Sequence, residues 1–411
     1  MSGKVCDSGV LTPVDEAIRH LLDQAPPPPP VQRVALDQAL ARVLAVDVLC
    51  PMNLPAWDNS AMDGYALRAE DLPIAGGYLA LAGRIAAGDG PGEPLSAGRV
   101  VRIFTGAPLP PGADTVVPQE SCRVEGKRVW LPSVNRGDHV RKEGEELRRG
   151  DRLLAAGTRL RAQELGLLAG AGIDRVEVFR PLQVGLLSSG DELREPGEPL
   201  APGQIYNSNR HSLAALLRGW GLEVHDFGVM PDQLLASRQA LRLAAAECDV
   251  LITSGGVSVG EEDHLKHAIE ALGSIDLWRL AIQPGKPLAF GDVEGKPWIG
   301  LPGNPSAALI TALIVVRPFL FRAQGMRDVL PTPLQVPAGF DWLKRNRRRQ
   351  YLRARLVAGV NGHLCVELHP QQSSAMLTAA CWADGLAVVE RDAQVHKHDP
   401  VMYLPFASLM H

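Results

Sequence analysis

A regular alternation of apolar strands and amphipathic helices between residues 181 and 328 limits the fold more than any other feature of this chain. We predict strands at residues 182–190, 222–228, 249–256 and 277–282, a hairpin at 286–303, and helices at 208–221, 234–247, 263–273 and 304–321. Strands and helices that alternate at this spacing form a mainly parallel sheet with helices on both faces. We therefore expect a central doubly wound α/β domain.

The flanking segments follow a different pattern and indicate further domains. With 411 residues, the chain is too long for one ordinary core. Short strands separated by Gly and Pro fill residues 53–140 and 329–411, with hairpins around Gly126 and Asn361-Gly362. We predict an α/β multidomain protein with four domains: a discontinuous domain I (1–52 plus 141–180), an inserted small β-rich domain II (53–140), the α/β domain III (181–328) and a β-barrel-like domain IV (329–411).

The N-terminal region predicts two helices joined by a stiff connector. In the first helix Thr12 is the expected cap and Pro13 the first residue. Its apolar side chains share one face: Val14, Ala17, Ile18, Leu21 and Leu22. The five prolines at 26–30 read as a polyproline spacer, and a second, short helix is expected around residues 38–44. A further helix is expected at 162–170.

The composition argues against several classes of partner. The formal net charge of -4 gives no general attraction to nucleic acid or to an anionic membrane. The six cysteines are scattered without a C-x-x-C pair, which favours a reducing cytosol over a disulfide framework or a zinc finger. Arg317 and Pro318 interrupt the most apolar stretch of the sequence, 307–321, and we expect this stretch to be too short to span a bilayer. We expect a cytoplasmic protein that binds neither nucleic acid nor membrane.

Three predicted strand ends carry small and polar residues that suit an anion. Ligands of such sheets bind beyond the carboxyl ends of the strands. Glycines let amide groups converge there, and the helix starts that follow, at Asp263 and Asn304-Pro305, attract negative charge. The candidate residues are Ser189 and Gly190 in the first loop, Ser254, Gly255, Gly256, Ser258 and Asp263 in the second, and Pro302, Gly303, Asn304 and Pro305 in the third. Each loop alone is explained by a well-capped helix, but the three together favour a phosphate site.

Four carboxylates and one lysine fall near the same predicted edge. Carboxylates beside a phosphate site recruit Mg²⁺, because the ion bridges phosphate oxygens and offsets their repulsion. The candidate ligands are Asp191, Glu192, Asp232 and Asp263. A role as helix or turn caps remains open for Asp191 and Asp263. Lys286 follows Gly285 between two prolines, where its ammonium group can meet a phosphate.

The short stretch "DNSAMDG" at residues 58–64 gathers two carboxylates, an amide and a hydroxyl between apolar neighbours. One explanation for Asp58, Asn59 and Asp63 is that their side chains form hydrogen bonds that brace the local turn, and this explanation stays open for each of them. No P-loop, G-x-G-x-x-G or nucleophile-elbow pattern occurs at the strand ends, which disfavours dinucleotide binding and hydrolase chemistry.

Taken in order, seven motifs resemble those of the molybdopterin molybdenumtransferase family, which comprises bacterial MoeA and the E domain of eukaryotic gephyrin. They read "DNSAMDGYA", "RIFTGAPLPPGAD", "SSGDEL", "IYNSNR", "SGGVSVGEED", "PGKPLAFG" and "GLPGNP". The resemblance runs from about residue 12 to the C-terminus. It implies a homodimer of four-domain subunits that takes adenylylated molybdopterin and molybdate and, with Mg²⁺, cleaves the phosphoanhydride, inserts the metal and releases AMP in the last step of molybdenum cofactor synthesis.

The same resemblance implies roles for individual residues. Asp63 would project from domain II into the partner's cleft, which Thr105 lines, while Glu192, Asp232 and Asp263 act on nucleotide and metal. Pro302 and Pro305 shape the last loop, and Arg141, Arg279 and Lys286 are the cations that remain for an oxyanion. In domain IV, Arg353 and either Ser373 or Ser374 are candidates. Contacts with other proteins of the same pathway are a further expectation.

This chain departs from the family pattern at several positions. Gln283 and Arg279 stand where lysines are common, Glu143 replaces a usual cation, Glu146 stands for a frequent Asp, and "GNPSA" replaces "GNPVS". A lost cation weakens an oxyanion site, so these changes affect individual molybdate contacts and leave the molybdate or tungstate preference open.

Two other functions stay open at this point. A molybdopterin adenylyltransferase shares the α/β domain, but it does not need the first 180 residues or the C-terminal β domain. A scaffold or storage protein would bind molybdopterin without turnover, and Gln283 and Glu143 give that alternative some weight. The basic run at 344–355 also suggests nucleic-acid binding. It has no interleaved aromatic residue beyond Tyr351, however, so a solvated strand edge explains it better.

Overall fold

The computed structural model describes residues 11–256, 264–359 and 362–410. The chain divides into two compact units. Unit 1 comprises Met1–Ala45, Gly157–Arg161 and Glu177–His411, and unit 2 comprises Val46–Ala156 and Ala162–Val176. The finer division into four domains stays a prediction.

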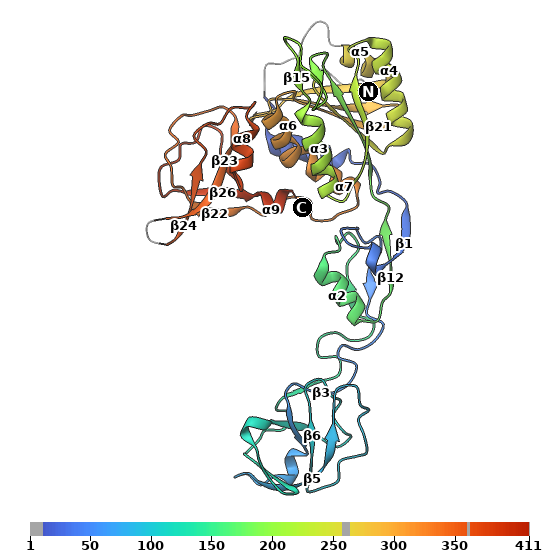
Figure 1. Cartoon of the computed structure of the whole chain (residues 1–411), viewed down its shortest axis with the longest axis vertical. Coiled ribbons are helices and arrows are strands. Elements are labelled where there is room, and N and C mark those ends of the chain that lie inside the picture. The colour runs from blue at the N-terminus through green and yellow to red at the C-terminus, as the bar shows by residue number, and fades with distance from the viewer. Residues whose placement is uncertain (1–10, 257–263, 360–361, 411) are drawn as a thin grey trace. The chain divides into compact units, whose positions relative to one another are not determined.

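A sheet that includes β21 forms the centre of unit 1 (Figure 1). It has six strands in the order β16-β13-β17-β21-β20-β18. The strands are β13 (Gln183–Ser189), β16 (Glu223–Met230), β17 (Val250–Ser254), β18 (Gly273–Arg279), β20 (Pro287–Val293) and β21 (Lys296–Leu301). β16, β13, β17 and β21 run parallel, whereas β20 is antiparallel to both of its neighbours. The predicted strand at 277–282 is wrong in extent, because β18 ends at Arg279 and Ile282–Gln283 (β19) joins another sheet.

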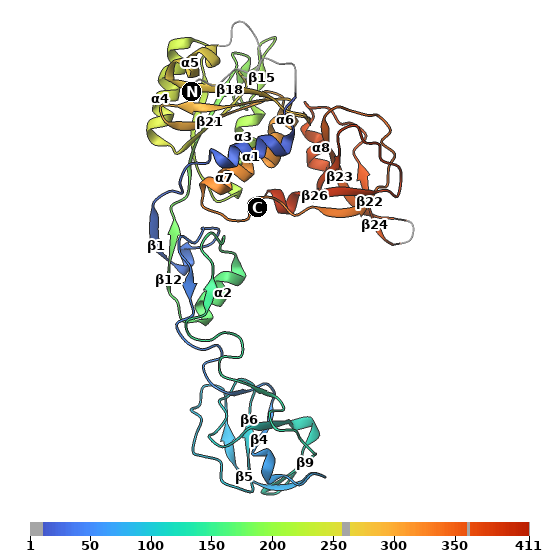
Figure 2. The same ribbon diagram turned by 180° about the vertical axis from the view of Figure 1, so that it is seen from behind.

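Helices cover both faces of this sheet, as a doubly wound fold requires. One face packs against α1 (Val14–Asp23), α3 (Ser208–Gly219), α6 (Pro305–Thr311), η4 (Ala312–Val316) and α7 (Arg317–Ala323), which Figure 2 shows from behind. The other packs against α4 (Leu234–Glu247) and α5 (His264–Leu272). Side chains of β17 alternate accordingly: Val250 and Ile252 belong to the first core, and Leu251 to the second. The predicted α/β fold class is confirmed.

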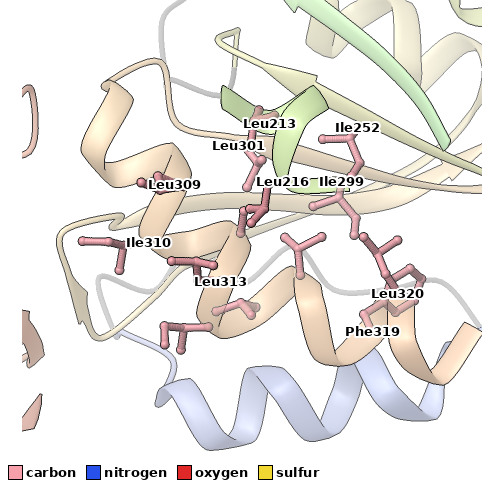
Figure 3. Packing of buried hydrophobic residues seen from close by; sticks show 14 of the residues in the cluster. Leu213, Leu216, Ile252, Ile299, Leu301, Leu309, Ile310, Leu313, Phe319 and Leu320 are labelled. Carbon is pink, nitrogen blue, oxygen red and sulfur yellow. The ribbon is translucent and has the colours of Figure 1, made fainter. Parts of the chain in front are cut away.

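The core of unit 1 is built around one apolar helical run. Ile252 and Ile299 of the sheet pack with Leu313, Phe319 and their neighbours from this run (Figure 3). The helical run continues from Pro305 to Ala323, which confirms the predicted helix at 304–321 and shows that Arg317 and Pro318 interrupt the apolar sequence without ending the helix. Pro318 has no N–H to donate, and the π-helical segment Ala312–Val316 directly before α7 carries the change of register. The expectation that this run is too short to span a membrane is wrong, because its 19 residues are long and apolar enough, but 94% of it is buried inside the structure.

The N-terminal part of unit 1 matches the prediction only in its first helix. α1 buries Val14, Ala17 and Leu21, but Pro13 occupies the cap position and makes no side-chain cap bond. The predicted helix at 38–44 is wrong. A single 3₁₀ turn, η1 (Leu36–Gln38), is followed by bridges from Val43 to Arg159 and from Leu44 to Val178. Val43 and Leu44 are both buried, so their tertiary pairing overrides the local helical pattern.

The C-terminal part of unit 1 is a second mixed sheet with two short helices. Its path is β19-β23-β25-β26-β22, and β24 also pairs with β23. The elements are β22 (Leu334–Pro337), β23 (Arg349–Ala358), β24 (Leu364–Leu368), α8 (Leu377–Trp382), β25 (Gly385–Val389), β26 (Pro400–Pro405) and α9 (Phe406–Leu409). Because β19 pairs with the start of β23, this sheet is joined directly to the α/β part. The Asn361-Gly362 turn lies partly outside the described residues.

Unit 2 is built on a six-stranded sheet with the order β7-β4-β6-β5-β9-β8. Its elements are β2 (Val48–Leu49), β3 (Asn59–Ser60), β4 (Gly64–Leu67), η2 (Ala69–Asp71), β5 (Gly77–Ile85), β6 (Arg99–Ile103), β7 (Thr115–Pro118), η3 (Gln119–Ser121), β8 (Arg123–Glu125), β9 (Arg128–Leu131), β10 (Val140–Arg141), β11 (Arg152–Leu154) and α2 (Ala162–Gly170). The predicted hairpin around Gly126 and the predicted helix at 162–170 are confirmed. Two further strands are β1 (Val31–Ala35) and β12 (Arg175–Phe179).

Candidate functional site

A cavity of about 810 Å³ opens at the carboxyl ends of the parallel strands in unit 1. β13 connects to β16 on one side, while the chain after β17 continues to the other side, so the direction of winding reverses between β13 and β17. Such a switch point is where open α/β sheets bind ligands. The cavity is lined by Ser189, Gly190, Glu192, Leu193, Ile205, Tyr206, Asn207, Ser208, Asn209, Asp232, Ser254, Gly255, Gly256, Pro287, Pro302, Gly303, Asn304, Pro305 and Ala375.

Two glycines let the chain pack closely at this edge. Gly190 has a φ of +146°, and a Cβ there would lie 2.5 Å from Oε2 of Glu192. Gly255 has a φ of +84°, and a Cβ there would collide with the carbonyl oxygen of Ser189. Both residues therefore favour glycine for their conformation, and Gly255 also needs it for space, because its neighbour is backbone. At position 190, the absence of a side chain is what lets the Glu192 carboxylate lie against the main chain.

Two helices begin at the cavity wall. The Asn207 side chain caps α3 by accepting a 3.2 Å hydrogen bond from the amide of Arg210. Asn304 occupies the cap position of α6, but its side chain makes no cap bond, so the predicted capping is wrong in this detail. It donates instead to Oγ of Ser374 at 3.2 Å. The amides of the first turn of α6 are therefore free of that side chain, and their partial positive charge faces the strand ends.

The charged side chains on the cavity wall are both acidic. Glu192 and Asp232 line it, whereas no lysine or arginine does so among the residues that the structure describes. Asp191 accepts a 3.2 Å hydrogen bond from the Asp232 amide and lines a neighbouring cavity of about 540 Å³ with Arg194 and Arg210. An anionic ligand in the larger cavity would thus meet amides, hydroxyls and two carboxylates.

The structure brings most of the predicted unit 1 residues to this cavity. Eleven of them line it: Ser189, Gly190, Glu192, Asp232, Ser254, Gly255, Gly256, Pro302, Gly303, Asn304 and Pro305. Ser258 and Asp263 lie outside the described residues. Arg279 and Lys286 are not on the wall. Arg279 is paired with Pro287 at the end of β18, and the carbonyl oxygen of Lys286 accepts from the amide of Leu280.

Sequence reasoning missed several wall residues in the segment 205–209. Tyr206 is half exposed at the cavity and donates from its hydroxyl to the carbonyl oxygen of Glu198 at 2.9 Å. Asn209 donates from Nδ2 to the carbonyl oxygen of Gly303 at 2.8 Å, which ties α3 to the loop after β21. The motif "IYNSNR" was a signal for this segment, but it gave no position for its side chains.

In unit 2, Asp63 lies between β3 and β4 and binds across to the loop after β6. One carboxylate oxygen accepts hydrogen bonds from both N and Oγ1 of Thr105, each at 2.8 Å. The bond from the amide, followed in size of effect by the bond from the hydroxyl, holds the pKa of Asp63 below its ordinary value. Asp63 is therefore not a local Asx brace. Arg141 lies in β10, opposite Asn59 of β3.

Asp58 and Asn59, by contrast, stabilise the turn itself. Asp58 accepts from Nζ of Lys142 at 2.7 Å and from the amide of Glu143 at 2.8 Å. Partial burial raises the pKa of Asp58, but these two hydrogen bonds lower it, and the net direction is downward. Asn59 is buried and donates to the carbonyl oxygen of Trp57 at 3.3 Å.

Comparison with known proteins covers nearly the whole chain. Residues 12–172 match the MoeA N-terminal region (domain I and II), 185–322 a probable molybdopterin binding domain, and 335–406 the MoeA C-terminal region (domain IV). The chain is 36% identical to the molybdopterin molybdenumtransferase of Haemophilus influenzae over 97% of its own length and 99% of the relative's.

The chain belongs to the MoeA family.

Other members agree with this assignment. Molybdopterin molybdenumtransferase 2 of Mycobacterium tuberculosis is 37% identical over 78% of this chain and 82% of its own length. A solved MoeA structure from Pyrococcus horikoshii is 30% identical, has a TM-score of 0.74 and covers 97% of this chain and 99% of its own. A second solved MoeA structure from the same organism is 26% identical, has a TM-score of 0.80 and covers 96% of this chain and 100% of its own. The predicted family, and with it a transferase enzyme, is confirmed.

Two departures from the MoeA pattern have local partners in the structure. Glu143, in place of a cation, accepts from Nδ2 of Asn53 at 2.6 Å. Gln283, in place of a lysine, accepts through Oε1 from Asn346 and, at 3.2 Å, from Nη2 of Arg348. A guanidinium from the C-terminal part thus contacts the side chain at the position where the family resemblance led us to expect a lysine.

The C-terminal part of this MoeA protein also reaches the cavity rim. Ala375 lies on the wall, and Ser374 binds Asn304. Arg353 is 0% exposed, and its Nη2 donates to the carbonyl oxygen of Ser373 at 3.1 Å, while Nε and Nη1 have no hydrogen-bond partner among the described residues. Burial lowers the pKa of Arg353 to about 10. The basic run at 344–355 is therefore not a free cationic surface along its whole length.

Proposed function

We propose that this protein inserts molybdenum into adenylylated molybdopterin, breaking the phosphoanhydride bond and releasing AMP in the last step of molybdenum cofactor biosynthesis. One observation carries the proposal: at the winding reversal between β13 and β17, glycine loops, two helix starts and two carboxylates surround one cavity. Amides and hydroxyls suit the oxygens of a phosphoanhydride and of molybdate, and carboxylates suit a metal or a proton. The relatives' shared name supports the same reaction.

In this proposal the three loops hold the substrate. The amides of Ser306, in the first turn of α6, and of Gly256 would bind phosphate oxygens, helped by Ser189 and Ser254. Tyr206 offers an aromatic face to a heterocycle. Ser258 and Asp263, which follow Gly256 in the chain, are proposed to complete the second loop. Arg279 and Lys286 are proposed as cations at its margin.

We propose that Mg²⁺ assists, held by Glu192 and Asp232 together with substrate oxygens. Within the described residues, no group of three or more His, Cys, Asp or Glu side chains is placed to hold a metal alone. Mg²⁺ nevertheless fits here, since it commonly binds through one or two carboxylates plus phosphate oxygens. The ion would neutralise charge that develops on the phosphoanhydride. Asp191 and Asp263 are proposed as further ligands.

The active form is proposed to be a cytoplasmic homodimer in which the Asp63 turn enters the partner's cavity, with Thr105 and Arg141 nearby. Trp57 is 55% exposed and Met62 is 43% exposed, so the turn carries apolar surface that an assembly would bury. Five cysteines in the described residues are free thiols, which suits a reducing compartment. Other proteins of the pathway would deliver the pterin and take the product.

The assay that tests this function uses purified protein, adenylylated molybdopterin, molybdate and Mg²⁺. We expect AMP release that requires molybdate. Glu192→Gln should lower its rate by at least about 100-fold, while Glu177→Gln on β12 keeps full activity. A scaffold would bind the pterin and release nothing. An adenylyltransferase would form the adenylylated pterin from ATP. Either result would reject the proposal.

A further inference from the structure

Unit 2 places two arginines side by side on one face of its sheet. β5 and β6 pair in parallel, and their register sets Arg84 opposite Arg102. The guanidinium carbons of Arg84 and Arg102 lie 4.7 and 4.8 Å from the ring centroid of Phe104. Arg102 also lies 5.1 Å from the ring centroid of Tyr65. The aromatic rings hold both cations in place.

No carboxylate forms an ion pair with either arginine among the described residues. Arg102 donates to the carbonyl oxygen of Gly64 at 3.3 Å and to Oε1 of Gln119, both of which are uncharged acceptors. Arg84 is exposed. Like charges opposite one another on neighbouring strands destabilise a sheet, and here only the aromatic rings and the more distant charge of Asp63 offset that cost.

The pair lies beside the turn that the proposed function assigns to the reaction. Phe104 directly precedes Thr105, whose amide and hydroxyl hold Asp63. The positive charge of Arg102 is close enough to contribute to the low pKa of Asp63. The acid-lined cavity of unit 1 shows the opposite imbalance, because it presents two carboxylates and no cation among the described wall residues.

We infer that Arg84 and Arg102 form a binding site for a tetrahedral oxyanion, either molybdate or a phosphate group of the nucleotide. Two guanidinium groups provide several N–H donors in planar forks, and a tetrahedral anion has enough oxygens to accept from both. A bound dianion would also remove the repulsion between the two arginines. This inference rests on the proposed function for its choice of ligand, and it assigns to unit 2 the cations that the unit 1 cavity lacks.

Calorimetric titration of the full-length protein with molybdate, inorganic phosphate and AMP tests the site. The variant is Arg84→Gln, and the matched control is Arg99→Gln, an exposed arginine of β6 that lies three residues from Arg102 and so on the opposite face of the sheet. We expect Arg84→Gln to lower the affinity for the probe that binds by about 10-fold relative to the control. If Arg84→Gln loses affinity for molybdate and for phosphate, the site binds oxyanions in general. If it loses affinity for AMP alone, the site binds the nucleotide phosphate.

A second variant and a thermal scan show whether a loss of affinity comes from misfolding of the variant. Arg102→Lys keeps the charge but removes the fork, and we expect a smaller loss of affinity than for Arg84→Gln. Arg84→Gln should melt at the same temperature as the control or higher, because it relieves the repulsion. Equal affinity of Arg84→Gln and Arg99→Gln for all three probes would overturn the inference.

The same proteins distinguish this failure from failure of the proposed function. If the wild-type protein releases no AMP while Arg84→Gln still weakens oxyanion binding, the reaction is wrong and the site stands. If the wild-type protein turns over and Arg84→Gln matches Arg99→Gln in affinity and in AMP release, the reaction stands and the site is wrong.

Discussion

Gly190 is the single residue that most directly fixes a proposed catalytic carboxylate. Its φ is +146°, and a Cβ there would lie 2.5 Å from Oε2 of Glu192, so the flexible Glu192 side chain would have to move aside. We predict that Gly190→Ala moves Glu192 and lowers the rate of AMP release by at least about 10-fold, because small displacements of a positioned group are costly.

A matched control separates this displacement from backbone strain. Gly203 also has a positive φ, of +88°, but a Cβ there would meet nothing within 4 Å. Gly203→Ala therefore adds strain without contact and should keep near-normal turnover. If the two variants lose activity equally, the position of Glu192 is not what Gly190 protects.

The bond between Asp63 and Thr105 predicts a pH effect. Both donors of Thr105 stabilise the charged carboxylate and hold its pKa low, so Asp63 stays ionised to lower pH than an ordinary aspartate. Thr105→Val removes the hydroxyl donor and raises the pKa of Asp63 toward its ordinary value. We expect the acid limb of the rate profile for AMP release to move to higher pH.

The control for this experiment is Thr332→Val, an exposed threonine in unit 1. Its acid limb should coincide with that of the wild-type protein. An unchanged acid limb in Thr105→Val would mean that ionisation of Asp63 does not limit the reaction.

Among the elements, α1 is tied to the C-terminal sheet by an ion pair. Arg349 at the start of β23 donates to both oxygens of Asp15, at 2.7 and 2.8 Å, and to Glu390 at 2.9 Å. The hydrogen bonds from Arg349 lower the pKa of Asp15. The lowered pKa means that this pair contributes stability at pH values above the unfolded pKa of about 3.8 and loses it as the pH falls through the lower folded value.

Asp15→Asn should therefore lower the melting temperature by roughly 1 to 2 °C at pH 7, since exposed pairs contribute about 1 kcal/mol or less. The difference from the wild-type protein should shrink below pH 4. Asp23→Asn, at the exposed end of the same helix, should show no such difference at either pH. A difference that persists at pH 3 would assign the effect to packing and not to charge.

The apolar helical run makes a prediction about the core. Leu313 lies in the π-helical segment and is fully buried against the sheet (Figure 3). Leu313→Ala should cost about 3 kcal/mol in the free energy of unfolding, because it removes contacts and leaves a cavity. Leu235→Ala on α4, where the side chain is 73% exposed, should change it by less than about 0.5 kcal/mol. Urea titration measures both.

The elements of the α/β part were predictable from the sequence because their periodicities are long and regular. The strands and helices between 183 and 323 lie close to their predicted positions, and so do the glycine loops that form the cavity. Short elements were less predictable: Val43 and Leu44 pair with residues more than 100 positions away, and no local pattern encodes such contacts. Tyr206 and Asn209 were missed for the same reason, since their place on the wall depends on how α3 meets the loop after β21.

At the scale of the whole molecule, the proposed function draws on features of both units. The cavity of unit 1 is acidic, while unit 2 presents Asp63 between β3 and β4, Thr105 in the loop after β6, and the arginine pair on β5 and β6. In a symmetric dimer each site can draw one group from each subunit. A proposed reaction that needs both Glu192 and Asp63 then depends on assembly.

This dependence predicts complementation between two inactive proteins. Asp63→Asn and Glu192→Gln should each abolish AMP release as homodimers. If Asp63 acts on the partner's cavity, a mixed dimer contains one site with both defects and one with neither. After unfolding and refolding in equal amounts, about half of the dimers are mixed, so activity should recover to about a quarter of the wild-type value. Asp63→Asn mixed with the double variant Asp63→Asn/Glu192→Gln should recover nothing. In a site built within one subunit, every mixed dimer would lack one group per cavity, and the first mixture would stay as inactive as the second.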